Sequence, residues 1–163
     1  MSKPYISLFL LAVLLLAGCA QQIVPTETAA PAADEGGFDE VLATKLGADD
    51  YGMSRYVIAF LYAGENRDRD STEAVELQRA HLKNIRRMAD EGTLVMAGPF
   101  LDQGDLRGIY IFDVATIEEA QALTESDPAI QAGSLRMELR PWYGSAAIKH
   151  VSEIHDRIRR IKF

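Results

Sequence analysis

The chain has 163 residues, a formal net charge of −7 and a single cysteine. The net negative charge opposes binding to nucleic acid, or to an anionic lipid surface, through the field of the whole molecule. A single cysteine cannot form a disulfide within the chain, so an exported form of this protein has none.

The first 18 residues have the pattern of an export signal. Lys3 precedes an apolar run over residues 6–16, which is shorter than the roughly 20 residues needed to span a bilayer. Leu16-Ala17-Gly18-Cys19 resembles the lipobox of bacterial lipoproteins, in which the cysteine is lipidated and becomes the first mature residue. We therefore expect residues 1–18 to be a lipoprotein signal peptide and Cys19 to be lipidated. An ordinary signal peptide with a chance cysteine is the alternative.

This interpretation predicts an exported lipoprotein that is anchored to the membrane of the cell envelope and faces the periplasm in a Gram-negative cell. Residues 19–37 contain Pro25, Pro31 and few large apolar side chains. Such a segment cannot bury enough surface to offset its ordering entropy, so it is predicted to be a disordered tether. Residues 38–55 form an N-terminal flank whose apolar spacing predicts a short helix before Gly47.

The first elements of the domain follow in order. Residues 56–62 are apolar at both odd and even positions, which predicts a strand buried on both faces. After a polar loop over residues 64–70, Ser71 or Thr72 is predicted to cap a helix that Gly92 ends. The inward stripe of this helix is predicted to hold Ala74, Leu77, His81, Ile85 and Met88.

Three further strands and a second helix complete the domain. Strands are predicted within residues 93–101, 107–114 and 135–140, and the last has one apolar and one polar face. Thr116 and Glu119 form a capping box that opens the second helix. The order is βαββαβ, which predicts a ferredoxin-like α+β fold with an antiparallel sheet over residues 56–143. Isoleucine and valine spacing predicts a C-terminal helix within residues 144–163.

The two faces of the sheet predict an oligomer. Two helices can cover only one face of a four-stranded sheet, whereas the first and third strands are apolar on both faces. A sheet from a second subunit is the simplest cover for the other face. The pattern therefore predicts a homodimer.

Four segments resemble, in order and spacing, the motifs of the YCII-related domain family. They are Arg79-Ala80-His81-Leu82, residues 92–100 with Gly98-Pro99-Phe100, residues 127–133 beginning with Asp127-Pro128, and Arg140-Pro141-Trp142. The resemblance implies a dimeric ferredoxin-like α/β barrel whose invariant histidine and aspartate face a cleft, and these roles fall on His81 and Asp127. Some relatives act on small cyclic or aromatic compounds, including a dehydrochlorinase of chlorinated hydroquinones. Unlike most members, which are cytoplasmic, this chain carries an export signal and extra flanks.

A histidine–carboxylate pair suits proton transfer at neutral pH. Imidazole, with a pKa of about 6.5, can accept and return a proton, and a bonded carboxylate fixes its tautomer. We therefore predict elimination or isomerisation of a small cyclic or aromatic ligand, with His81 and Asp127 as catalytic residues and no cofactor. Arg79, Gly98 and Pro99 are the predicted substrate-binding residues. Arg79 is suited to a carboxylate or phenolate, but two positions from His81 on a helix it points elsewhere, toward a partner subunit or, in the favoured alternative, toward solvent.

Other interpretations stay open at this level. His81 in an apolar stripe is also the pattern of a core histidine bonded to a backbone carbonyl. The same fold could serve as a non-catalytic binding or interaction module with a structural His81–Asp127 hydrogen bond. Residues 107–112 faintly resemble an RNA-recognition strand, although isoleucines stand where stacking aromatics are needed. His150 and His155 are about 140° apart on a helix, so no metal site is predicted.

Overall fold

The computed structural model describes residues 37–161. The predicted signal peptide, the lipidation of Cys19 and almost all of the predicted tether lie outside these residues. Within residues 37–161, no helix is long and apolar enough to cross a membrane.

The described chain contains four strands, five α-helices and one 3₁₀ helix. In chain order they are α1 (Glu40–Leu46), β1 (Met53–Ala63), α2 (Ser71–Asp90), β2 (Leu94–Pro99), β3 (Leu106–Phe112), α3 (Ile117–Glu125), α4 (Pro128–Gln131), β4 (Leu135–Ser145), the 3₁₀ helix η1 (Ala146–His150) and α5 (Val151–Ile158).

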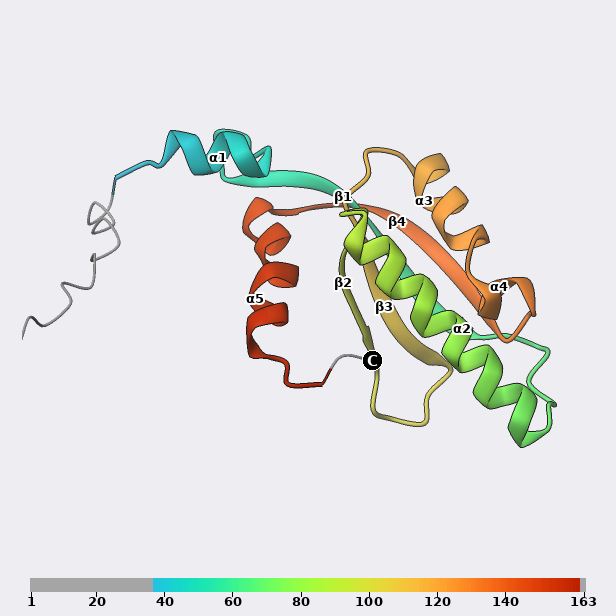
Figure 1. Cartoon of the computed structure of the whole chain (residues 1–163). Helices are drawn as coiled ribbons and strands as arrows, with labels where there is room; N and C mark the ends of the chain where they lie inside the picture. The colour runs from blue at the N-terminus through green and yellow to red at the C-terminus, as the bar shows by residue number, and fades with distance from the viewer. Residues whose placement is uncertain (1–36, 162–163) are drawn as a thin grey trace, which may run out of the picture. The chain divides into compact units, whose positions relative to one another are not determined.

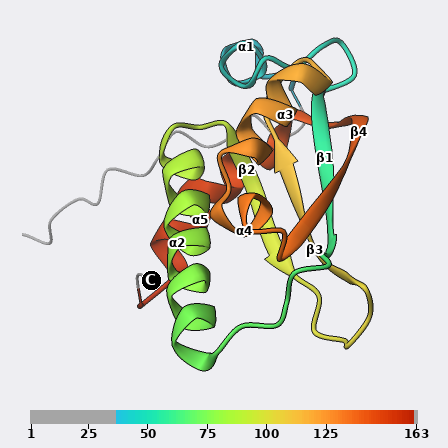
Figure 2. The same ribbon diagram turned by 90° about the vertical axis from the view of Figure 1, so that its right-hand side faces the viewer.

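The strands form one antiparallel sheet in the order β2-β3-β1-β4 (Figure 1). Together with the chain order β1-α2-β2-β3-α3-β4, this is the ferredoxin-like arrangement, so the predicted α+β fold is confirmed. α2, α3 and α4 lie on one side of the sheet (Figure 2). We call this side the helix-covered face and the other side the helix-free face.

Strand register places alternate side chains of β1 and β3 in the core under the helices. Val57 lies opposite Phe112, and Ala59 lies opposite Tyr110, so all four point to the helix-covered face. Their cluster also contains Met88 of α2 and other buried residues: Leu61, Leu94 and Ala120. Tyr110 brings the one hydroxyl group into this buried cluster.

The helix-free face is closed at one end by the C-terminal segment. Tyr56, Val95 and Ile111 form a second buried cluster, against which Ile148 of η1 packs. β4 extends to Ser145, so the predicted C-terminal helix consists of the 3₁₀ helix η1 followed by α5. Farther along this face, Phe60 and its neighbours are only half-buried.

The details of α2 differ from the sequence prediction in two ways. Asp70 caps the helix, because its side chain accepts hydrogen bonds from the backbone N–H groups of Thr72 and Glu73, so the predicted Ser71 or Thr72 cap is wrong. Gly92 follows the helix with a φ of +77°, as expected for the residue that ends it. Ala74 is exposed rather than buried, because the first half of α2 borders a cleft.

Candidate active site

The side chains of His81 and Asp127 are in contact on the side of α2 that faces the sheet. The histidine Nδ1 atom is 2.9 Å from both carboxylate oxygens of Asp127, although the residues are 46 positions apart. Contacts between α2 and α4 bring them together, since His81 lies on α2 and Asp127 directly precedes α4. The aspartate is fully buried, and the histidine is 9% exposed.

The Asp-Pro step explains how the carboxylate is held. Asp127 is the N-cap of α4, and its Oδ1 atom accepts a hydrogen bond of 2.9 Å from the backbone N–H of Ala129. Pro128 occupies the first helical position, where its missing N–H costs nothing. A buried carboxylate needs such partners, because an unpaired charge in the interior is strongly unfavourable.

Tyr110 is the third member of the site. Its hydroxyl lies 3.2 Å from His81 Nε2 and 3.5 Å from Asp127 Oδ2. Burial, and then the negative charge of Asp127 and the hydrogen bond to it, raise the pKa of Tyr110 far above its ordinary value of 10.0. The side chain is therefore a neutral phenol and a hydrogen-bond donor at physiological pH.

These contacts fix the state of the imidazole ring. Asp127 in its ionised form can only accept, so Nδ1 of His81 carries a proton and donates it to the carboxylate. In the neutral ring Nε2 is then the acceptor, and it faces the hydroxyl of Tyr110. Nε2 is thus the atom of His81 that can take up a proton.

A cleft of about 510 Å³ lies between α2 and the strands β2 and β3. His81 and Tyr110 form part of its wall, and the fully buried Asp127 lies behind them. The apolar part of the wall consists of Leu61, Ala74, Leu77, Leu82, Ile85, Ala97, Pro99, Phe100, Ala129 and Leu135. This volume is in the range of roughly 300 to 1,000 Å³ that is typical of small-molecule sites.

Of the three predicted substrate-binding residues, two line this cleft. Gly98 and Pro99 lie at the end of β2, where that strand pairs with Gly108 of β3. A Cβ atom on Gly108 would lie 2.6 Å from the carbonyl oxygen of Gly98, so only glycine permits this close pairing.

Arg79 does not line the cleft. It is exposed on α2, two positions from His81, and this spacing turns it about 200° around the helix axis away from the histidine. The predicted contact of Arg79 with a ligand in the cleft is therefore not formed within this chain.

Three other arginines line the cleft: Arg67, Arg69 and Arg107. They are not among the predicted site residues, because residues 64–70 have the pattern of a polar loop and residues 107–114 that of an apolar strand. Tyr110 was missed for a related reason. The available signal was a phenol at an inward position of β3, since a buried tyrosine hydroxyl requires a hydrogen-bond partner.

The described residues contain no group of three or more His, Cys, Asp or Glu side chains that could hold a metal ion. His150 lies 3.2 Å from Glu153 and pairs with that carboxylate. His155 is exposed on α5.

The fold and the site define a class of protein: a ferredoxin-like α+β domain with a buried histidine–aspartate pair at the wall of a cleft. Residues 56–143 match the model of the YCII-related domain family, and the chain belongs to this family.

The chain is similar to two known proteins. It is 31% identical over 62 residues to the uncharacterized protein YjpA of Bacillus subtilis (strain 168), covering 38% of this chain and 71% of YjpA. A similar solved structure is 5-chloro-2-hydroxyhydroquinone dehydrochlorinase (TftG) from Burkholderia phenoliruptrix AC1100, in complex with 2,5-dihydroxybenzoquinone. It is 21% identical, superimposes with a TM-score of 0.40, and covers 55% of this chain and 93% of TftG.

Proposed function

We propose that this protein is an enzyme that moves a proton on a small cyclic or aromatic compound, in an elimination or an isomerisation. The observation that carries the proposal is the His81–Asp127 pair, whose histidine lines a cleft. Such a pair resembles the base and orienting group of general acid–base catalysis.

The chemistry follows from the atoms at the wall. The lone pair of His81 Nε2 takes a proton from a carbon next to a carbonyl group, and the C–H electrons pass into that carbonyl as an enolate. Asp127 compensates the positive charge that forms on the imidazolium ring. In an isomerisation, Nε2 returns the proton to another carbon. In an elimination, the leaving group departs with its bonding electrons, and the imidazolium releases the proton to solvent.

Tyr110 can serve both protonation states of His81. With a neutral imidazole, its hydroxyl donates to Nε2, the shorter of its two contacts. When the hydroxyl turns toward Asp127 Oδ2, at 3.5 Å, it frees the lone pair of Nε2 for the substrate, and it keeps this contact while the ring is an imidazolium. Because its pKa is raised, Tyr110 keeps its phenolic proton and is a poor proton donor to a substrate, so it does not replace His81 in the proton transfer.

One observation favours the alternative, a non-catalytic binding module. Both nitrogen atoms of His81 have partners inside the protein, Asp127 at Nδ1 and Tyr110 at Nε2. A purely structural histidine would show the same contacts.

His81→Asn separates the two functions. The wild type is first screened for turnover of a panel of cyclic acids, phenols and lactones. Loss of a general base should then reduce the turnover of a converted compound by about 10² to 10⁴-fold while the domain stays folded. His155→Asn, the same change at an exposed histidine, is the control and should be fully active. A folded, fully active His81→Asn protein would rule out the catalytic role.

We also propose that the protein is a homodimer through the open part of the helix-free face. The support is the half-buried, largely apolar surface around Phe60 and Ile109, beyond the reach of η1. Sedimentation at micromolar concentration should show a dimer for the wild type and a monomer for Phe60→Asp. Val75→Asp, at an exposed apolar position on α2, should remain dimeric. A monomeric wild type contradicts this proposal.

The predicted export rests on the pattern of residues 1–18 and the predicted anchor on residues 16–19, and we propose on that basis a lipoprotein anchored through Cys19 to a membrane of the cell envelope. Cys19→Ala should abolish labelling by radioactive fatty acid and change the fractionation of the protein with membranes. Unchanged labelling and unchanged fractionation of this variant would contradict the anchor.

A further inference from the structure

The rim of the cleft is positively charged, in contrast to the chain as a whole. Asp and Glu outnumber Lys and Arg by 24 to 17 in the sequence. Yet the lining includes Arg67, Arg69 and Arg107, and no Asp or Glu of residues 37–161 lines the cleft.

Backbone carbonyl groups hold two of these guanidinium groups in place. Arg67 Nη1 donates to the carbonyl oxygen of Ser134 at 3.2 Å, and Arg69 Nη2 donates to that of Ala132 at 2.6 Å. A second nitrogen of Arg69 donates to the carbonyl oxygen of Asn66. These contacts orient the guanidinium groups without neutralising their charge. Each group has five N–H donors, so several stay available to a ligand.

The third arginine has an unused donor. The Nε atom of Arg107 is buried and has no hydrogen-bond partner. Such an atom carries a desolvation cost unless a ligand pairs with it. In the part of the chain that the structure describes, none of the three arginines forms an ion pair with Asp or Glu.

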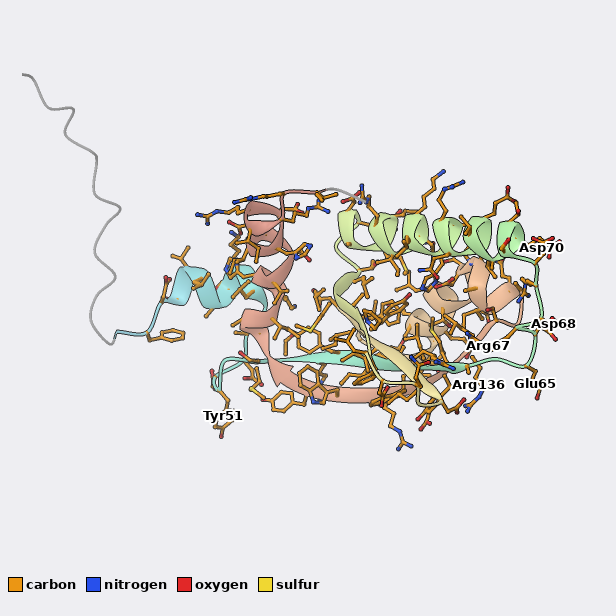
Figure 3. The ribbon with its side chains drawn as sticks, turned by 90° about the horizontal axis from the view of Figure 1, so that it is seen from below. Tyr51, Glu65, Arg67, Asp68, Asp70 and Arg136 are labelled. Carbon is orange, nitrogen blue, oxygen red and sulfur yellow. The ribbon has the colours of Figure 1, made fainter. Side chains whose placement is uncertain are left out.

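The acidic residues near Arg67 do not offset its charge. Figure 3 shows Arg67 directed inward from its loop, whereas Glu65 and Asp68 of the same loop point outward. All three lie within the segment that connects β1 to α2. The loop therefore presents its cation to the cleft and its carboxylates to solvent.

We infer that the arginine rim is a carboxylate-binding subsite, so that the ligand of this cleft is a small cyclic carboxylic acid bound as its anion. Guanidinium groups bind carboxylates through paired, charge-assisted hydrogen bonds. The apolar body of the acid would lie against Leu77, Ile85 and Phe100, which line the same cleft. The inference deepens the proposed function by naming the substrate class, and it rests on that function in assuming that the cleft beside His81 is where the substrate binds.

The test compares an acid with its neutral analogue. Binding of benzoate and of benzamide to the purified full chain is measured by isothermal titration calorimetry. Benzoate should bind about tenfold more tightly than benzamide, and added salt should weaken only benzoate, since ionic contacts at a rim are screened. Arg67→Gln and Arg107→Gln should each abolish most of this preference. Arg67 is exposed, so its variant remains informative if Arg107→Gln fails to fold.

The control is Lys83→Gln, which removes the same charge from an exposed position on α2 outside the cleft. It should keep the preference for benzoate. Equal binding of the two probes, binding of neither at millimolar concentration, or an equal loss in Lys83→Gln would overturn the inference.

His81→Asn distinguishes this inference from the proposed function. The variant should still prefer benzoate to benzamide, because its arginine rim is intact, although it should be inactive in the turnover screen. An intact benzoate preference in a wild type that converts no panel compound would leave the subsite standing and contradict the enzyme. Turnover without any benzoate preference would contradict the subsite alone.

Discussion

The two faces of the sheet each bury a tyrosine, and the two hydroxyl groups have different surroundings. Tyr56 on the helix-free face is 2% exposed, and its hydroxyl donates to the backbone carbonyl of Ser145 at 3.2 Å. Tyr110 on the helix-covered face is 3% exposed, and its hydroxyl meets the ionisable side chains of His81 and Asp127. The Tyr56 hydroxyl thus pairs with the backbone, whereas the Tyr110 hydroxyl belongs to a cluster of polar side chains.

The difference arises from what covers each face. η1 follows directly on β4, so its Ile148 packs on the helix-free face. On the other face, α2 carries a histidine toward the sheet and the Asp-Pro step before α4 supplies a carboxylate. A similar strand pattern therefore gives an apolar layer on one face and a buried polar cluster beside a cleft on the other.

The largest expected difference between substitutions on the two faces is in the rate of turnover. Asp127→Asn preserves the size of the side chain and an oxygen for the N–H of Ala129, but it removes the charge that stabilises an imidazolium at His81. Turnover should fall by about 10² to 10⁴-fold. Tyr56→Phe, on the opposite face, should keep the wild-type rate. Equal rates for Asp127→Asn and wild type, measured in the same assay, would remove the functional difference between the faces.

A smaller effect is expected on the free energy of unfolding when Gly108, which lines the cleft, is replaced. Gly108→Ala places a Cβ atom 2.6 Å from the carbonyl oxygen of Gly98, so β2 and β3 must separate. The free energy of unfolding should fall by about 1 to 3 kcal/mol. Gly98→Ala meets no atom within 4 Å and is the matched control. Urea denaturation that finds the two variants equally stable would contradict this account of the strand pairing.

The smallest predicted effect concerns alkaline pH. Folding raises the pKa of Tyr110, chiefly through burial, so above its ordinary pKa of 10.0 the unfolded chain loses the phenolic proton first. The stability that this group contributes is fully present below pH 10 and is lost as the pH rises further, by up to about 1.4 kcal/mol per pH unit. Tyr110→Phe should lose less stability than the wild type between pH 9 and pH 11, as measured by urea midpoints. Equal losses of stability in the variant and the wild type would contradict the raised pKa of Tyr110.

Much of the fold could be predicted from local patterns. Apolar runs and the Thr116–Glu119 capping box gave the order of strands and helices, which the structure confirms. His81 and Asp127 were predicted as a pair from motif resemblance rather than from local pattern, and the structure places them 2.9 Å apart. Their catalytic role stays a prediction.

The rest of the site depends on contacts between distant segments. The guanidinium groups of Arg67 and Arg69 are held by the carbonyls of Ser134 and Ala132, and sequence spacing carries no information about that pairing. Arg79 differs from these arginines: it is close to His81 in the sequence, but the two-residue spacing turns the two side chains to different sides of the helix. Tyr110 could be assigned to the site only from the strand register, because the alternation of side chains does not show which face of the sheet the helices cover.

The central claim is that His81 transfers a proton, and deuterium exchange tests it most directly. A compound that the wild type converts is incubated with enzyme in D₂O, and uptake of deuterium at the reacting carbon is followed by proton NMR. The account predicts exchange with the wild type and with His155→Asn, and exchange slowed by about 10² to 10⁴-fold with His81→Asn. Exchange at the wild-type rate in folded His81→Asn, or no exchange by the wild type with any compound of the panel, would contradict it.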